Sequence, residues 1–358
     1  MKKVNRSTER MEKPEITVGI DLGDRFSTYC MLNEDGELVE RGRIKSEEAA
    51  LRRHFEDSER YRIVIECGTH SPWISRLLKR FGHQVIVANA RKIKSVTGRK
   101  AKNDEKDAEE LAHLGYCDPF LLSPIQHRSV ERQQDLNLIR ARDTLVRART
   151  MIVNSVRGLV KSAGARLPKC STKSFSERTK DSIPEELREL AIPLLQQIEQ
   201  LGEQIGGLDR KIEQMAQRYP EIRILRTAPG VGPIVGAAYV LTLDRPEAIA
   251  KSRQVGPFLG LRPGQSQSGD SDPQLRISKE GNGYLRKLLV QAGHYILGRF
   301  GPDSQLRRWG LKLASSGGKR GKKRAVVAVA RKLAVILHSM WRHKASFQAF
   351  PEVAAKTA

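Results

Sequence analysis

Cysteine is scarce in this 358-residue chain, and its placement excludes the usual cysteine-based architectures. The four cysteines, Cys30, Cys67, Cys117 and Cys170, lie far apart and include no CxxC pair, so neither a disulfide framework nor a thiolate zinc site is indicated. We expect them to be buried free thiols. Long apolar runs are also missing, because no stretch approaches the roughly 18 apolar residues of a membrane-spanning helix. The start of the chain lacks the apolar core of a signal peptide, so the sequence predicts a cytoplasmic protein.

Negative charge is scarce relative to positive charge. Sixty-four Lys and Arg residues against 41 Asp and Glu residues give a formal charge of +23 and a pI near 10.1. A surplus of this size is typical of a chain that binds a polyanion. Nucleic acid is the leading candidate for that partner, and a membrane surface is the alternative.

The first third of the chain alternates between strand and helix patterns. After a polar tail, residues 1–15, which we expect to be disordered, the β-branched run ITVGIDLG predicts a buried strand that ends at Asp21. Two more strands joined at the turn EDG follow, and then helix, strand, helix and strand patterns in SEEAALRRHFED, YRIVIECG, SPWISRLLKRFG and HQVIVAN. A further helix begins near Asp104. The alternation predicts an α/β domain over residues 16–120, with its central strands covered on both faces.

The next part of the chain has helical sequence patterns and is rich in Arg. Two long helical patterns, residues 129–164 and 184–218, are separated by the polar segment PKCSTKSFSERTKDSIP, which has the character of a loop. They predict an antiparallel helical hairpin, a coiled-coil arm over residues 121–221. A mainly α-helical C-terminal domain is expected over residues 222–345, followed by a tail, residues 346–358.

The C-terminal domain opens with a glycine-rich turn between two apolar helical segments, LRTAPGVGPIVGAAYVLTL. This pattern fits a helix-hairpin-helix motif, in which backbone amides approach a phosphate, and it fits a plain turn in a helical core equally well. The stretch GQSQSGDSDPQ has almost no apolar content and predicts an exposed loop of the kind that often carries function. The cluster KRGKKR is either a solvated helix start or a phosphate contact.

Four acidic residues stand at positions where they can converge. Asp21 and Glu66 each follow a hydrophobic strand, and Asp104 and Asp107 lie on one face of a helix. Acids at a helix start are common, so each position alone says little. Carboxylates that converge repel one another unless a cation holds them, and an all-oxygen set suits Mg²⁺ or Mn²⁺. Two such ions about 4 Å apart can activate and stabilise the oxygens of a phosphodiester, which explains acids in so basic a chain.

This ordered set resembles the DEDD transposases of the insertion-sequence family numbered one hundred and ten, and the related Piv-type DNA invertases. LRTAPGVGPIVGAAYV, FLGLRPGQSQSG and ISKEGNGYLRKLLVQAG resemble the C-terminal transposase domain of that family in content and order. The resemblance extends from about Ile16 to Trp341. It implies a RuvC/RNase H-like N-terminal domain whose four carboxylates hold Mg²⁺.

The resemblance also implies a covalent mechanism. Ser268, in a Ser-Gly motif with Gly269, corresponds to a serine that joins covalently to DNA as the nucleophile. Relatives commonly have two adjacent serines before this glycine and a basic residue after it, whereas this chain has SQSGDSD, so Ser266 and Ser271 stay open as alternatives. The basic residues around RISKEGNGYLRK are candidate phosphate contacts: Arg276, Lys279, Arg286 and Lys287.

The same resemblance implies partners. Members of the family resemble recombinases that use a structured noncoding RNA to pair with donor and target DNA, and two kinds of nucleic acid would explain the surplus positive charge. The arm would mediate assembly into a homo-oligomer, a dimer or tetramer, in a prokaryotic cytoplasm at the nucleoid. Two alternatives compete with this hypothesis: a RuvC-like metal-dependent nuclease that uses water, and a non-enzymatic nucleic-acid-binding protein.

Overall fold

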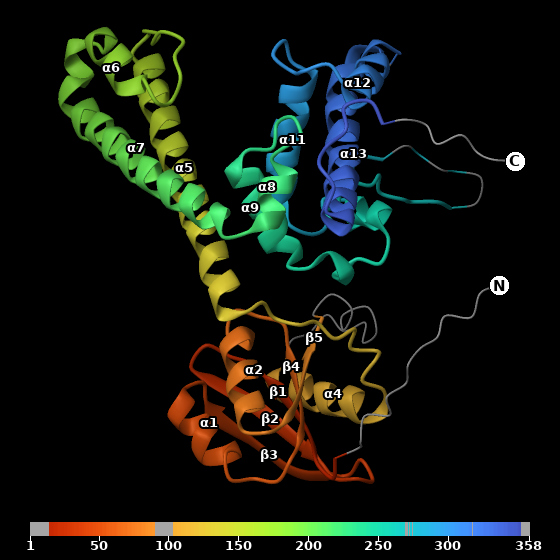
Figure 1. Ribbon diagram of the computed structural model, residues 1–358. Helices are drawn as coiled ribbons and strands as arrows, with labels where there is room; N and C mark the ends of the chain where they lie inside the picture. Colours follow the sequence, from red (N-terminus) through yellow and green to blue (C-terminus); the bar gives the residue numbers. More distant parts are fainter. Residues whose placement is uncertain are drawn as a thin grey trace, which may run out of the picture. The chain divides into compact units, whose positions relative to one another are not determined.

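The structure of the chain is a computed structural model that describes residues 14–89, 103–268, 271, 273, 275–316 and 318–351. The chain divides into two compact units, Met1–Arg128 and Ser129–Ala358, each of which packs around its own buried residues (Figure 1). Among the described residues, no helix combines the length and the apolar character that crossing a membrane requires.

The first unit is built on a five-stranded mixed sheet in the order β3-β2-β1-β4-β5. The first three strands form an antiparallel meander, and β4 and β5 continue the sheet parallel to β1. The strands have the bounds β1 (Thr17–Asp21), β2 (Phe26–Leu32), β3 (Leu38–Lys45), β4 (Arg62–Glu66) and β5 (Gln84–Ala88). A hairpin turn at Asn33–Gly36 joins β2 to β3, where the sequence EDG predicted it, and Gly36 supplies the positive φ of 82°.

Helices cover both faces of this sheet, as predicted. On one face α1 (Glu48–Phe55) and α2 (Ser71–Arg80) pack on the branched side chains of the central strands, and on the other face lies α4 (Asp104–Cys117) (Figure 1). The burial alternates because successive strand residues point to opposite faces. Ile20 and Ile65 pack toward α1 and α2, whereas Val64 packs against Leu111 of α4.

The second unit begins with two long helices that pack along each other, α5 (Val130–Ser162) and α7 (Arg188–Gln217) (Figure 1). The segment predicted as a loop, PKCSTKSFSERTKDSIP, contains α6 (Phe175–Thr179) and the 3₁₀ helix η1 (Lys180–Ser182). A second 3₁₀ helix, η2 (Glu185–Leu187), follows it and leads into α7. Phe175 is fully buried among apolar residues of α5 and α7. One buried aromatic therefore anchors a segment whose composition is otherwise polar.

The remainder of the second unit is helical and shares a single core. Tyr239 lies at its centre, fully buried, and its hydroxyl donates to Ala334 O at 2.6 Å. The α-helices are α8 (Pro220–Leu225), α9 (Pro233–Leu243), α10 (Val255–Phe258), α11 (Gly283–Leu297), α12 (Gln305–Ser316) and α13 (Gly321–His343). The 3₁₀ helices are η3 (Pro246–Ala248), η4 (Ser252–Gln254) and η5 (Gly318–Arg320).

The predicted fold class is confirmed at the level of an α/β unit followed by a mainly helical unit, and the strand order is consistent with a RuvC-like fold. The coiled-coil arm, the helix-hairpin-helix motif and the finer domain limits stay predictions. Most of the predicted N-terminal tail lies outside the described residues. The cysteines are free, as expected, but Cys67 and Cys117 are exposed, so the expectation that all four are buried was wrong.

Candidate functional site

Asp21 is the last residue of β1, and it points to the face of the sheet that α4 covers. A Cβ atom added at Gly19, two residues earlier on the same face, would lie 2.1 Å from Ala108 O of α4. The side chain of Asp21 is half-buried. The strand therefore delivers its terminal carboxylate to the place where α4 begins.

Small residues let α4 lie unusually close to the sheet. At Gly115, near the other end of the helix, an added Cβ would lie 2.3 Å from Val64 Cγ2. Arg62, which is buried beneath the helix, donates from Nη1 to Gly115 O at 3.1 Å. Burial in this position lowers the pKa of Arg62. Together these contacts fix the height and direction of the helix over β1 and β4.

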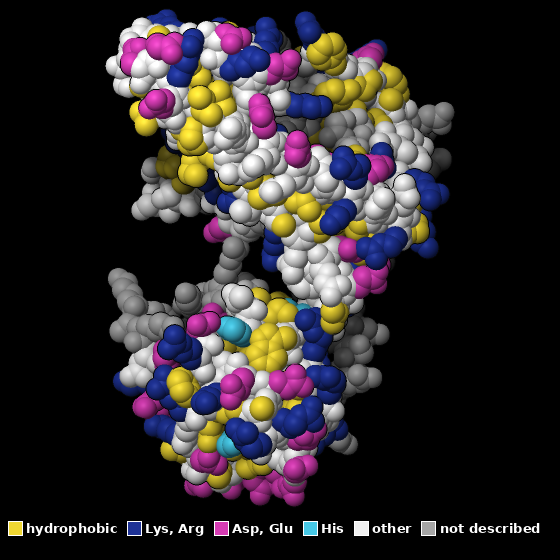
Figure 2. Space-filling view, turned by 90° about the vertical axis from the view of Figure 1, so that its left-hand side faces the viewer, with side chains coloured by type: hydrophobic (Ala, Val, Ile, Leu, Met, Phe, Trp, Pro, Cys, Tyr) yellow, Lys and Arg dark blue, Asp and Glu magenta, His cyan; other side chains and the backbone are white. Residues whose placement is uncertain are grey.

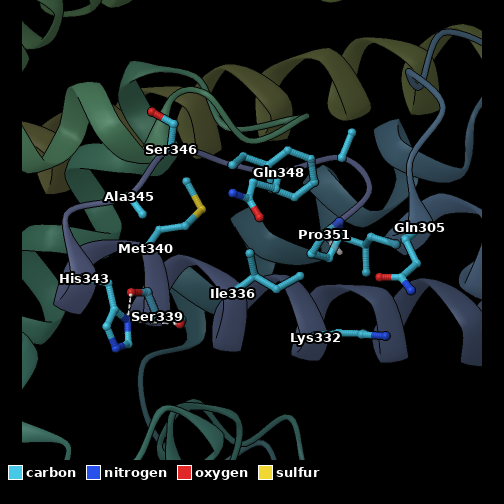
Figure 3. A pocket seen from close by; sticks show the side chains of 13 residues that line it. Gln305, Lys332, Ile336, Ser339, Met340, His343, Ala345, Ser346, Gln348 and Pro351 are labelled. Carbon is cyan, nitrogen blue, oxygen red and sulfur yellow. Dashed lines mark hydrogen bonds between the residues drawn. The ribbon is translucent and has the colours of Figure 1, made fainter. Parts of the chain in front are cut away.

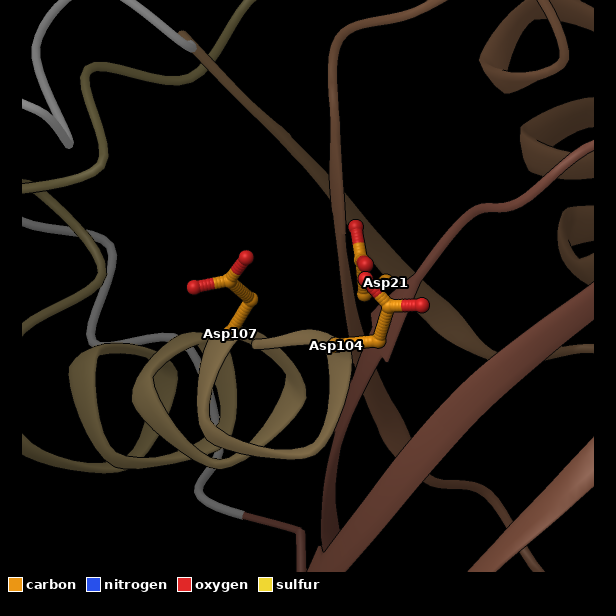
Figure 4. A group of neighbouring side chains, drawn as sticks. All are labelled: Asp21, Asp104 and Asp107. Carbon is orange, nitrogen blue, oxygen red and sulfur yellow. The ribbon is translucent and has the colours of Figure 1, made fainter. Parts of the chain in front are cut away.

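The first turn of α4 carries the other two aspartates. Asn103 caps the helix, because its side-chain oxygen accepts from Glu105 N at 3.1 Å and from Lys106 N at 3.3 Å. Asp104 and Asp107 then project beside Asp21, and each of the three residues offers a carboxylate oxygen such that these atoms all lie within 4.8 Å of one another (Figure 4). We refer to Asp21, Asp104 and Asp107 as the carboxylate group.

Glu66, the fourth predicted acid, ends the neighbouring strand on the same face. β1 and β4 are parallel with Ile20 opposite Ile65, so Asp21 and Glu66 are the next neighbours in register. Val64, two residues before Glu66, packs against α4, which places Glu66 on the α4 side. Among the described residues, however, the group within 4.8 Å contains the three aspartates and not Glu66.

The donor set fits a hard divalent cation. The carboxylate group offers only oxygen ligands, which suits Mg²⁺ or Mn²⁺ better than a metal that prefers sulfur or imidazole. Carboxylates this close repel one another in the absence of a counter-charge. The position of the group at the end of a strand and the start of a helix leaves it accessible, since Asp104 is exposed.

A histidine and an acid at the same edge of the sheet were not predicted. His70 follows β4 and Asp24 follows β1, and His70 Nε2 lies 3.5 Å from Asp24 Oδ1. Trp73 Nε1 donates to His70 Nδ1 at 3.2 Å, so in neutral His70 the proton is on Nε2, facing Asp24. The sequence did contain a signal for this pair, because IDLGD and ECGTH each place a polar residue shortly after a strand.

Ser268 lies in the second unit, at the exposed end of a hairpin-like loop. At the base of the loop Gly264 N donates to Arg276 O at 2.8 Å and Ser278 N donates to Arg262 O at 2.9 Å. Near the tip Ser268 and Ser271 exchange two backbone hydrogen bonds of 3.1 Å. Ser266, Ser268 and Ser271 are all exposed, and Gly269 lies outside the described residues.

Two glycines and an arginine close the base of this loop. A Cβ at Gly260 would lie 2.1 Å from Glu280 O, and a Cβ at Gly281 would lie 2.1 Å from Phe258 O; both glycines have positive φ. Arg286 Nη1 donates to Leu259 O at 2.8 Å and to Glu280 O at 3.2 Å, one carbonyl on each leg. The loop is thus held at its base although its tip is solvated.

The four candidate phosphate contacts differ in their surroundings. Arg276 and Lys279 are exposed on the outgoing leg of the loop. Arg286 closes the loop base, and Lys287 Nζ lies 3.4 Å from Asp143 Oδ1 of α5. Their role as phosphate contacts stays a prediction, and two of the four already have structural partners.

The second unit also has two pockets, and neither is lined by the serine loop or by the candidate phosphate contacts. One of about 510 Å³ lies at the glycine-rich turn and is lined by Arg226, Gly232, Gln291 and Tyr295 among others. The other, of about 350 Å³, lies between α13 and the segment after it, with Ile336, Met340 and other mostly apolar side chains in its wall (Figure 3). Neither contains a predicted catalytic residue.

Comparison with known proteins finds two family models that match parts of this chain. A family model described as a transposase, of the DEDD type of the IS110 family, matches residues 18–164, a range that includes all four predicted acids. A second model, described as the transposase IS116/IS110/IS902 family, matches residues 222–308, a range that includes Ser268. The first match runs from the first unit into the second, and the second match lies within the second unit.

Relatives extend the similarity over most of the chain. The transposase for insertion sequence element IS1111A of Coxiella burnetii is 25% identical over 92% of this chain and 91% of its own length. A probable family 20 transposase of Pseudomonas aeruginosa is 27% identical over 78% of this chain and 83% of its own length. The transposase for IS1328 of Yersinia enterocolitica is 26% identical over 83% of this chain and 89% of its own length. The chain belongs to the DEDD transposases of the IS116/IS110/IS902 family.

Proposed function

We propose that this transposase cuts and rejoins DNA with a divalent metal held by Asp21, Asp104 and Asp107, assisted by Glu66, and with Ser268 as the covalent nucleophile. The observation that carries the proposal is the carboxylate group, with its oxygens within 4.8 Å of one another. Mg²⁺ is the expected ion and Mn²⁺ its substitute, because the donors are all carboxylate oxygens. When bound, the metal would activate the attacking oxygen and stabilise the charge on the leaving oxygen.

The bond changes follow from serine chemistry. The Ser268 Oγ–phosphorus bond forms as one phosphorus–oxygen ester bond of the DNA strand breaks. The hydroxyl proton leaves Oγ, and the departing DNA oxygen takes up a proton. Joining reverses these steps when a new DNA hydroxyl displaces Ser268. An exposed serine on a loop with a fixed base suits this role, because the tip can reach a strand while the base stays in place.

Guide RNA and assembly belong to the same proposal. A formal charge of +23 exceeds what a small DNA contact surface needs, which supports a structured noncoding RNA as a second polyanionic partner. Lys and Arg side chains occur over both units on the face drawn in Figure 2, so positive charge is available on each of them. The arm formed by α5 and α7 would serve homo-oligomer assembly, and the glycine-rich turn before α9 would approach a DNA phosphate.

The test is a covalent trapping experiment. Purified protein, the noncoding RNA of its element, Mg²⁺, and donor and target DNA are incubated and run on denaturing gels. Wild type is compared with Ser268→Ala, Asp104→Asn and, as matched loop controls, Ser266→Ala and Ser271→Ala. We expect a protein–DNA adduct that Ser268→Ala and Asp104→Asn both abolish and that the loop controls retain.

Other outcomes separate the alternatives. Cleavage without an adduct, unaffected by Ser268→Ala but abolished by Asp104→Asn, identifies a metal-dependent nuclease that uses water. Loss of the adduct in Ser266→Ala or Ser271→Ala instead reassigns the nucleophile. Metal binding is measured directly by Mn²⁺ titration, in which Asp21→Asn should weaken binding at least about tenfold. Wild-type Mn²⁺ affinity in that variant would overturn the metal site.

A further inference from the structure

A row of residues crosses the sheet at the level of the carboxylate group. Asp21 of β1 pairs with Thr28 of β2, and Thr28 pairs with Arg43 of β3. Paired residues of neighbouring strands point to the same face, so all three lie on the α4 side. The contact between Arg41 Nη2 and Glu109 Oε1 of α4, 2.9 Å, confirms this orientation for the alternate residues of β3.

Arg43 lies on the α4 side of the sheet, and it is exposed. Its guanidinium carbon lies 4.5 Å from the centroid of the Phe26 ring, which is itself 40% exposed. No carboxylate forms an ion pair with Arg43 within the part of the chain that the structure describes. The guanidinium is therefore oriented by an aromatic ring while its donors face solvent.

Lys45 extends the positive charge along the same edge. It pairs with Phe26 across the strands and so projects on the same face. Its ammonium lies 3.9 Å from Glu47 Oε1, in a pair whose side chains are 61% and 53% exposed. Such an exposed pair contributes little and yields readily to a phosphate. We refer to Phe26, Arg43 and Lys45 as the β3 strip.

The distance from the strip to the acids suits one nucleic-acid strand. Arg43 is two strands away from Asp21, which is about 10 Å at the usual spacing of neighbouring strands. A strand whose scissile phosphate lies at the carboxylate group would carry its neighbouring phosphates across this edge, where Lys and Arg can neutralise them. Among the described residues, the β3 strip is a basic surface on the same sheet face as the aspartates.

We propose that the β3 strip binds the phosphate backbone of the DNA strand that is cut, next to the scissile phosphate. Arg43 contacts one phosphate through its fork of donors, Phe26 holds the guanidinium plane, and Lys45 contacts a neighbouring phosphate. These contacts are independent of base sequence and position the strand. The inference rests on the proposed function, since it assigns the strip to the substrate of the carboxylate group.

The first test measures binding rather than cleavage. Fluorescence anisotropy with labelled target DNA, in the presence of a chelator, compares wild type with the Arg43→Gln/Lys45→Gln double variant. The matched control is Arg53→Gln/Arg60→Gln, which removes the same charge from exposed positions away from this face. We expect the slope of log affinity against log salt to flatten by about 1.8 in the strip variant. An equal change in both double variants would overturn the proposal.

The second test locates the strand. A photo-crosslinking phenylalanine analogue at position 26 should join to DNA nucleotides beside the cut site, in complexes assembled with the noncoding RNA. Crosslinks to RNA alone would show that the strip serves the guide rather than the cut strand, and would also overturn the proposal. The proposed function is tested by a different readout, which is cleavage and adduct formation in Asp104→Asn and Ser268→Ala. The result of that test does not depend on what the β3 strip binds.

Discussion

At the scale of single residues, Gly19 supports the carboxylate group, because the backbones of β1 and α4 meet there. Any side chain there displaces the helix, since a Cβ would lie 2.1 Å from one backbone atom of α4 and 2.3 Å from another. We expect Gly19→Ala to lower the free energy of unfolding by about 1–3 kcal/mol. We also expect weaker Mn²⁺ binding, because Asp104 and Asp107 move with the helix.

Urea denaturation and Mn²⁺ titration test this expectation together. Gly158→Ala is the matched control, because an added Cβ at Gly158 in α5 meets nothing within 4 Å. That variant should be more stable than wild type by about 0.5–1 kcal/mol and bind Mn²⁺ normally. Unchanged stability and metal affinity in Gly19→Ala would mean that α4 is not fixed by this contact.

His338 gives the second unit a pH-dependent stability. It is fully buried, with Nε2 at 2.9 Å from Pro246 O and Nδ1 at 2.9 Å from Ser252 Oγ. Desolvation lowers its pKa below the usual 6.5, although the hydrogen bond to Pro246 opposes this. The unfolded chain therefore binds a proton more readily than the folded chain, and stability falls as the pH falls below 6.5.

The measurement is urea denaturation of wild type and His338→Gln between pH 5 and pH 8. The free energy of unfolding of wild type should fall toward low pH with a contribution from His338 of at most about 1.4 kcal/mol per pH unit. In His338→Gln this slope should be shallower, whatever its absolute stability. An identical slope in the two proteins would show that His338 titrates alike in both states.

At the scale of elements, the serine loop depends on how its two legs are joined. Arg286 donates to a carbonyl on each leg, which a lysine at this position cannot reproduce because it lacks the rigid fork. We expect Arg286→Lys to increase trypsin cleavage at Arg262 and Arg276 and to lower adduct formation through Ser268 at least about fivefold, since a net hydrogen bond is worth about 1 kcal/mol.

Arg286→Lys keeps the positive charge, so it distinguishes a residue that holds the loop from one that contacts phosphate. If Arg286 acts by holding the loop, DNA affinity should stay near the wild-type value in Arg286→Lys. Lys287→Gln serves as the proteolysis control, because it breaks the contact with Asp143 without touching the loop base. A normal cleavage pattern and normal adduct formation in Arg286→Lys would assign Arg286 to phosphate contact instead.

Elements with strong periodicity were predictable from the sequence, and elements held by distant contacts were not. The five strands follow from apolar runs, and the start of α4 at Asp104 follows from acids that favour the first turn of a helix. The helix α6 was missed because one buried side chain, Phe175, stabilises it from neighbouring helices. The paired legs of the serine loop were missed because Gly260 and Gly281 are distant in sequence and meet only in the fold.

The candidate site was predictable in its members but not in its geometry. Four acids at strand ends and on one helix face could be read from the sequence, and three of them converge. The height of α4 over the sheet decides which three acids come together. Gly19, Arg62 and Gly115 set this height through tertiary contacts. The position of Arg43 in the same row as Asp21, two strands away, depends on the register of two antiparallel strand pairs, which the sequence pattern does not specify.

For the molecule as a whole, surplus charge should dominate nucleic-acid affinity. The formal charge of +23 predicts binding that releases many counterions. We expect affinity for DNA of unrelated sequence to fall at least about a hundredfold between 50 and 200 mM salt. Anisotropy titrations at several salt concentrations measure this, and a loss below about threefold would show that the basic residues are not engaged with phosphate.

The division of the carboxylate group between a strand and a helix also matters during synthesis. A ribosome that has translated β1 to β5 has made Asp21 and Glu66, but neither acid of α4. Premature termination anywhere before Asp104 therefore releases a product without the complete carboxylate group. If the carboxylate group cuts DNA as proposed, that activity requires α4 to have been translated and to have docked on the sheet.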